Sequence, residues 1–163
     1  MKDVTLDATA ADAPVNALLT LPYPTFVRTS QIPWKPWVME GVEYKLLATD
    51  PKTNGFTCLL RVEAGTVAPV HHHLGAIEVY IVDGEIYYED SDIGGKDDYI
   101  YEPAGDVHRP VSPNGCTLFC VFHGPIAGLD DDGNLAGIVD AKMMRAMAEE
   151  HGVIGYLAET GAH

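Results

Sequence analysis

VHHHLGAIE, at residues 70–78, places three consecutive histidines in a segment that we expect to be an extended strand. Side chains alternate between the two faces of a strand, so His71 and His73 share one face while His72 points to the other. The first and third Cα atoms would lie roughly 6.6 Å apart, close enough for two imidazoles to bind one ion at about 2.1 Å. A second segment, PAGDVH, ends at His108. The sequence therefore predicts a metal site whose ligands are His71, His73 and His108.

Outward from this stretch, the chain consists of short runs of β-branched, aromatic and leucine residues separated by Gly, Pro and Asp. Asp83-Gly84 is expected to close a hairpin, because this dipeptide favours positive φ angles. Eight short strands predict an all-β fold of the jelly-roll or double-sheet barrel class. The expected strands cover residues 42–50, 56–64, 67–73, 77–83, 85–90, 99–103, 108–112 and 116–124.

The two ends of the chain differ from this central region. Four prolines interrupt residues 1–33, so we expect an arm that lies on the barrel and lends it an edge strand. Near the other end, Asp140 can cap a helix over about residues 140–151 that Gly152 ends. Its methionines are expected to dock on the barrel; they are Met143, Met144 and Met147. The expected organisation is one domain, 1–163, with an arm (1–33), a barrel core (34–124) and a C-terminal extension (125–163).

DDDGN, at residues 130–134, is superficially similar to the start of a calcium-binding loop. Such a loop needs glycine at its sixth position and a bidentate glutamate at its twelfth. Leu135 and Ala141 occupy those positions here. The stretch therefore predicts a solvated turn.

Composition excludes several classes of partner. The formal net charge is -14, from 24 acidic and 10 basic residues, so the surface should repel phosphate backbones and anionic membranes. The apolar run at residues 15–21 lacks a basic leader, and no run reaches the roughly 20 apolar residues of a membrane span. The three cysteines are odd in number and form no Cys-x-x-Cys pair, which favours free thiols. We expect a cytoplasmic protein without nucleic-acid or membrane partners.

The spacing of the histidine segments is similar to the paired motifs of the cupin superfamily. The matching residues are Gly65, His71, His73, Glu78, Gly84, Pro103, Gly105 and His108. The resemblance implies a cupin jelly-roll, or double-stranded β-helix, barrel. It also implies an Fe(II), Mn(II), Ni(II) or Zn(II) ion held by the three histidines, with Glu78 as an uncertain fourth ligand. Asp97 stands where the second motif usually has glycine, and the last gap of the first motif is one residue shorter. Both departures concern loop shape.

HGPIAGLDDDGNLAGIVD, at residues 123–140, extends the resemblance to the acetylacetone dioxygenase and 2,4'-dihydroxyacetophenone dioxygenase group. The group implies an Fe(II)-dependent enzyme that uses O2 to cleave a carbon–carbon bond of a small β-diketone or 2-hydroxyketone. A glutamate six positions before the last histidine lies near the iron in these relatives, and Glu102 occupies that position here. We expect Glu102 or Glu78 to handle the proton. Val79 replaces an aromatic residue of the diketone-cleaving enzyme, so the substrate does not carry over.

Alternatives remain open at this point. A non-oxidative metal-dependent isomerase or hydrolase, or a non-catalytic metal- or ligand-sensing cupin, would use the same histidines. Arg61 could project into the barrel or away from it, since strand alternation alone does not say which face is inward. His123 could lie beside the site or be a satisfied histidine of the core or of a subunit contact. Edge strands of small barrels often pair, which predicts a homodimer or homotetramer.

Overall fold

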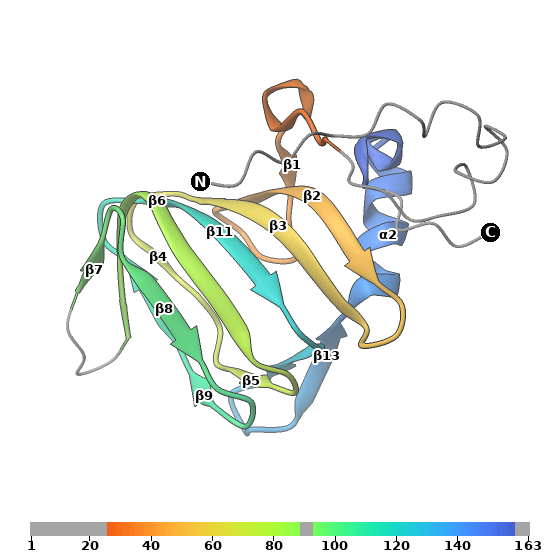
Figure 1. Ribbon diagram of the computed structural model, residues 1–163. Helices are drawn as coiled ribbons and strands as arrows, with labels where there is room; N and C mark the ends of the chain where they lie inside the picture. The colour runs from red at the N-terminus through yellow and green to blue at the C-terminus, as the bar shows by residue number, and fades with distance from the viewer. Residues whose placement is uncertain (1–25, 89–92, 159–163) are drawn as a thin grey trace, which may run out of the picture.

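The computed structural model describes residues 26–88 and 93–158, and these form a mostly antiparallel β-structure (Figure 1). The all-β fold class predicted from the sequence is confirmed. Within these residues, one α-helix, α2 (Ala141–Glu150), and two 3-10 turns, η2 (Thr29–Gln31) and η3 (Ile154–Tyr156), accompany the strands. The strands are β1 (Lys35–Pro36), β2 (Val42–Asp50), β3 (Gly55–Val62), β4 (Thr66–Val67), β5 (His71–His73), β6 (Ile77–Tyr88), β7 (Gly94–Gly95), β8 (Tyr99–Glu102), β9 (Val107–His108), β10 (Pro110–Ser112), β11 (Cys116–Phe122), β12 (Ile126–Leu129) and β13 (Leu135–Val139).

Two sheets surround the interior. The larger has the order β1-β2-β3-β11-β6-β10-β4, and β7 and β8 also pair with β6. The smaller has the order β13-β12-β5-β9. Every pairing between named strands is antiparallel. Figure 1 shows the larger sheet curled, with β5, β9 and β13 below it. The histidine strand β5 therefore belongs to the smaller sheet.

Strict alternation along β6 and β11 builds the core. Ile77, Val79 and Ile81 are buried, whereas Glu78 and Tyr80 between them face outward. On β11, the same rule buries every second residue from Cys116 to Phe122. Each large apolar side chain buried in this way contributes about 1.5–3 kcal/mol. A slip of one residue would turn the acidic and tyrosine side chains into the core, so burial sets the register.

The hairpin predicted at Asp83-Gly84 is wrong, because β6 runs without interruption through both residues. Gly84 has a φ of 80°, and the pairing with β11 shifts by one residue next to Asp83, which marks a bulge. A Cβ on Gly84 would lie 2.1 Å from the carbonyl oxygen of Gly115. The glycine thus permits a bend and a close approach inside one long strand, and does not end it.

The C-terminal extension contains two strands that the sequence analysis did not predict. β12 and β13 form a hairpin around residues 130–134, and β12 also pairs with the histidine strand β5. The predicted solvated turn is confirmed. Its carboxylate Asp130 accepts hydrogen bonds from the backbone N–H groups of Asp132 (3.0 Å) and Asn134 (2.8 Å). The missed hairpin therefore supports the strand that carries two of the expected ligands.

The predicted C-terminal helix is confirmed as α2, which packs against β2 and β3. Asp140 caps it by accepting a hydrogen bond from the backbone N–H of Met143 (2.8 Å), and Gly152 follows it with a φ of 69°. Met144 is fully buried and Met147 packs on the core, but Met143 is 38% exposed. The docking expectation therefore holds for two of the three methionines.

Part of the expected arm lies outside the described residues, which begin at residue 26. The portion that follows is held on the outer face of β2. Lys45 Nζ donates a hydrogen bond to the backbone carbonyl of Thr29 (2.9 Å), and the Trp34 ring lies 4.6 Å from that ammonium. The edge strand β1 begins just after the predicted arm and pairs with β2.

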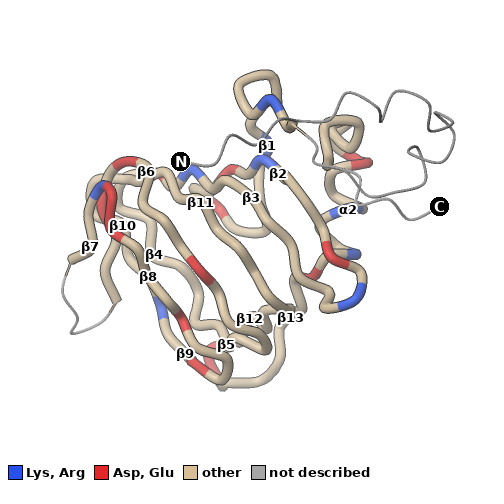
Figure 2. The backbone as a smooth tube through the Cα atoms, viewed as in Figure 1, with Lys and Arg blue, Asp and Glu red and all other residues tan. Residues whose placement is uncertain are grey.

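Charge is spread widely over the molecule. Figure 2 shows acidic residues and the fewer basic residues at separate places along the backbone. Within the described residues, α2 and the short 3-10 turns are all too brief or too polar to cross a membrane.

Candidate metal centre

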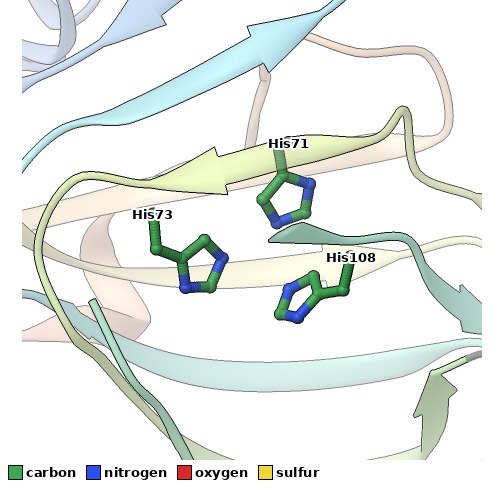
Figure 3. Close-up of side chains that lie close together, drawn as sticks. All are labelled: His71, His73 and His108. Atoms are coloured by element: carbon green, nitrogen blue, oxygen red, sulfur yellow. The ribbon is translucent and has the colours of Figure 1, made fainter. Parts of the chain in front are cut away.

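Three histidine side chains converge on one point inside the barrel (Figure 3). β5 and β9 pair so that His71 lies opposite His108, and alternation along β5 brings His73 to the same face. One ring nitrogen from each residue lies within 4.8 Å of the other two. His72, which pairs with Val107 on the other face, is not part of the cluster. The pairing of two short strands therefore assembles the donor set that the sequence predicts.

The chemistry of these nitrogens fits a divalent cation. Both ring nitrogens of His73 and Nε2 of His108 are buried without a hydrogen-bond partner. A buried polar group left unpaired costs about 1–3 kcal/mol, which a bound metal ion would remove. Burial, reinforced by the neighbouring histidines, lowers the pKa of His73 to about 3. Burial likewise lowers the pKa of His71. Both imidazoles are therefore held in the neutral form that metal binding requires.

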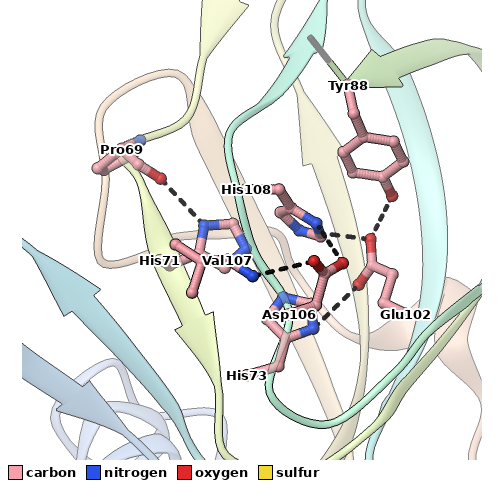
Figure 4. A network of polar contacts seen from close by, with 8 residues as sticks. All are labelled: Pro69, His71, His73, Tyr88, Glu102, Asp106, Val107 and His108. Carbon is pink, nitrogen blue, oxygen red and sulfur yellow. Dashed lines mark hydrogen bonds and ion pairs between the residues drawn. The ribbon is translucent and has the colours of Figure 1, made fainter. Parts of the chain in front are cut away.

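Hydrogen bonds behind the rings fix their orientation (Figure 4). His71 Nδ1 donates to the backbone carbonyl of Pro69 at 3.0 Å. His108 Nδ1 donates to the Asp106 carboxylate, also at 3.0 Å. In each case the bond leaves Nε2 as the free donor atom for a metal ion. The sequence analysis missed Asp106, which lies just before β9 and two residues from His108.

Glu102, at the end of β8, lies beside the histidines, as expected. Its Oε1 is 3.7 Å from His108 Nε2, and its Oε2 is 3.9 Å from His73 Nδ1. The Tyr88 hydroxyl donates a hydrogen bond to Oε1. Burial raises the pKa of the Glu102 carboxyl, while the Tyr88 hydrogen bond and the charge of His108 act in the opposite direction. A buried carboxyl of this kind is suited to accept and release a proton.

Glu78 lies elsewhere, on the outer face of β6. It accepts hydrogen bonds from His123 Nε2 (2.7 Å) and the Tyr99 hydroxyl (2.9 Å), and these bonds lower the pKa of its carboxyl. The expectation that Glu78 binds the metal or handles the proton is therefore wrong. Its buried neighbours on β6, Ile77 and Val79, occupy the inward positions.

Two further candidates also lie outside the barrel. Arg61 donates hydrogen bonds to Glu43, and its guanidinium lies 4.7 Å from the Trp34 ring centroid, so it does not project into the barrel. His123 is half exposed and bound to Glu78. Neither residue lines the cavity, and His123 is satisfied by an outer-face carboxylate rather than placed beside the metal centre.

A cavity of about 150 Å³ reaches the metal centre at His71. His71, Tyr88 and Glu102 form its polar end. Side chains from the central strands of the larger sheet and from the segment after β1 form its apolar wall, including Trp37, Met39, Leu60, Ile77, Leu118 and Phe122. The sequence analysis missed Tyr88, because nothing in EIYYED distinguishes it from its neighbour Tyr87 except alternation from the buried Ile86. The cavity can hold a small molecule with an apolar body and an oxygen-bearing end.

Comparison with known proteins finds a distant curated relative. An acetylacetone-cleaving enzyme of Acinetobacter johnsonii is 25% identical over 101 residues, which cover 58% of this chain and 66% of that protein. The chain thus spans just under two thirds of the length of this curated relative.

Solved structures show the same fold. An RmlC-like cupin protein of Ralstonia eutropha JMP134 is similar with a TM-score of 0.73 and 27% identity, over 81% of this chain and 91% of that one. An acetylacetone dioxygenase of Acinetobacter johnsonii gives a TM-score of 0.71 and 20% identity, over 76% and 90% of the two chains. Residues 23–127, well over half of the chain, match the ChrR cupin-like domain family. The chain therefore belongs to the ChrR cupin-like domain family, within the cupins.

Proposed function

We propose that this protein is an Fe(II)-dependent dioxygenase that uses O2 to cleave a carbon–carbon bond of a small β-diketone or 2-hydroxyketone. The observation that carries the proposal is a three-histidine donor set that meets, at His71, an apolar cavity of about 150 Å³ also lined by Glu102. The similarity to an acetylacetone-cleaving enzyme supports it. His71, His73 and His108 would hold the ion, and neutral ligands would leave it its full double positive charge.

When bound, Fe(II) would supply Lewis acidity toward the substrate oxygens and the capacity to react with O2. The protein's own residues account for the remaining requirements. The apolar wall of the cavity would seat the body of the ketone and exclude water from it. This arrangement favours substrates that carry two neighbouring oxygens at one end and hydrocarbon at the other.

Glu102 would handle the proton in the first step. Its Oε2 would take a proton from the acidic carbon of the ketone, so that the C–H bond breaks and its electron pair remains on the substrate as an enolate. Burial raises the pKa of this carboxyl, which strengthens it as a base once it is ionised. Both atoms of O2 would then end in the products, an acid and a second carbonyl compound.

The test is oxygen consumption by protein loaded anaerobically with Fe(II) and mixed with a panel of β-diketones and 2-hydroxyketones. We expect at least one ketone to give O2 uptake equal to its own loss. The matched control is His73→Ala, which lacks a ligand and should consume none. Absence of uptake with every chelating ketone would contradict the proposal.

A second candidate is a metal-dependent isomerase or hydrolase that does not use O2. The observation that favours it is the donor set itself, because three neutral imidazoles suit Zn(II) as well as Fe(II), Ni(II) or Mn(II). Turnover of a ketone by the zinc-loaded protein without oxygen would support this alternative.

A further inference from the structure

We propose that Tyr88 is a positioning residue, which holds Glu102 beside the three histidines while keeping its carboxylate from binding the metal ion. The inference rests on the metal-binding part of the proposed function and not on its oxygen chemistry. Its basis is the contact between the Tyr88 hydroxyl and one carboxylate oxygen of Glu102, within reach of the metal centre.

The curl of β6 creates this contact. Ile77, the first residue of β6, pairs with Glu102 on β8. Tyr88, the last residue of the same strand, pairs with Pro110, two residues after His108. The two ends of β6 thus meet the same site from different sides. The Tyr88 ring lies 4.5 Å from the His108 ring, and its hydroxyl points to Glu102 Oε1 (Figure 4). One side chain therefore packs on a candidate ligand and binds the neighbouring carboxylate.

Glu102 lies close enough to bind the metal if nothing restrained it. Its oxygens are 3.7 Å from His108 Nε2 and 3.9 Å from His73 Nδ1. Two ligand atoms bound at about 2.1 Å in tetrahedral geometry lie roughly 3.4 Å apart, so the separation of Glu102 Oε1 from His108 Nε2 is close to that between two ligands of one ion. A buried carboxylate without a donor would turn toward a nearby cation, since desolvation makes an unpaired charge costly. The Tyr88 hydroxyl supplies that donor instead.

The arrangement has two chemical consequences. A ligated carboxylate would offset part of the charge of the ion and would occupy a position that a chelating substrate needs. Held by Tyr88, Glu102 leaves that position open and keeps Oε2 available for a proton. Outside the barrel, the Tyr99 hydroxyl donates a similar hydrogen bond to Glu78. This pair lies away from the histidines, so it provides a matched control.

The test uses the full chain stripped of metal and titrated with Co(II), whose visible absorption reports its ligands. Affinity is measured in parallel by competition with a chromophoric chelator. We expect Tyr88→Phe to change the cobalt spectrum, as a carboxylate joins the ion, and to tighten binding by about tenfold, because an added anionic ligand attracts the cation. Glu102→Gln alone and the double variant Tyr88→Phe/Glu102→Gln should both resemble the wild type. Tyr99→Phe should also leave spectrum and affinity unchanged.

Each other outcome would overturn the inference. A Tyr88→Phe protein with the spectrum and affinity of the wild type would show that the hydroxyl restrains nothing. A changed spectrum for Glu102→Gln alone would show that Glu102 already binds the metal, and this variant decides the matter even if Tyr88→Phe fails to fold. If the wild type binds no cobalt, the three histidines do not form a metal site and the inference fails. Because neither ketone nor O2 is present, failure of the dioxygenase proposal would not change these readings.

Discussion

Two glutamate–tyrosine pairs show how position decides the chemistry of identical residues. Glu102 and Tyr88 meet inside the barrel, where burial raises the pKa of the carboxyl. Glu78 and Tyr99 meet on the outer face, where hydrogen bonds lower the pKa of the carboxyl. The inner carboxyl is therefore easier to protonate than the outer one, whose lowered pKa favours the ionised form. Only the inner pair can therefore take part in reactions at the metal centre.

Substitution of the histidines can test whether successive side chains of β5 point to opposite faces. His71→Ala, His73→Ala and His108→Ala should each abolish stoichiometric metal binding, because each removes one of three converging donors. His72→Ala should retain it, since this side chain lies on the other face of β5. Elemental analysis of the purified variants after loading with Zn(II) would measure the difference. Loss of metal from His72→Ala would contradict the strand register.

Substitution of each glutamate by glutamine should affect the protein differently. Glu102→Gln should lower kcat for ketone-dependent O2 uptake by about 10²–10⁴-fold, because an amide cannot accept the proton. Glu78→Gln is the matched control and should keep the metal content of the wild type, since Glu78 lies outside the site. Steady-state oxygen consumption by iron-loaded protein measures the first effect. Equal rates for wild type and Glu102→Gln would remove Glu102 from the proposed reaction.

Along each strand, the direction of a side chain could be predicted only as far as the strand continues without a bend or bulge. His71 and His73 share one short strand, so their common face followed from the period of two. Glu78 is separated from these histidines by the bend at residues 74–76. The period of two does not continue through a bend, so the positions of the histidines could not predict which face Glu78 occupies. β13 was missed because four of its five residues are exposed, which leaves no apolar alternation to recognise.

Substitution of Gly84 can test whether β6 continues through this residue. Gly84→Ala should lower the free energy of unfolding by about 1–3 kcal/mol from its left-handed backbone alone, and the 2.1 Å approach of its Cβ to Gly115 O adds to this cost. Gly95→Ala is the control, because a Cβ there meets nothing within 4 Å. Urea denaturation followed by circular dichroism would compare the two. Equal stabilities would show that Gly84 lies in a loop able to relax, as a simple hairpin would allow.

At the scale of the whole molecule, the metal centre joins parts of the chain that are distant in sequence. His71 and His73 lie on β5, and His108 on β9, which is the last strand of the smaller sheet. An ion bound by all three would link these strands only in the folded state, because the unfolded chain does not hold its histidines together. Metal binding should therefore stabilise the native protein as a unit.

Labelling of the cysteines can measure how much metal binding stabilises the native protein. Cys58, Cys116 and Cys120 are all buried, and burial raises the pKa of each thiol, so native labelling by a disulfide reagent should be limited by unfolding. Free Zn(II) at 100 times its dissociation constant should stabilise the wild type by about 2.7 kcal/mol and slow labelling by about 100-fold. His73→Ala should label at the same rate with and without zinc. If the wild type is labelled fast and at a rate that does not depend on zinc, the reagent reaches the thiols by local opening that leaves the metal centre intact.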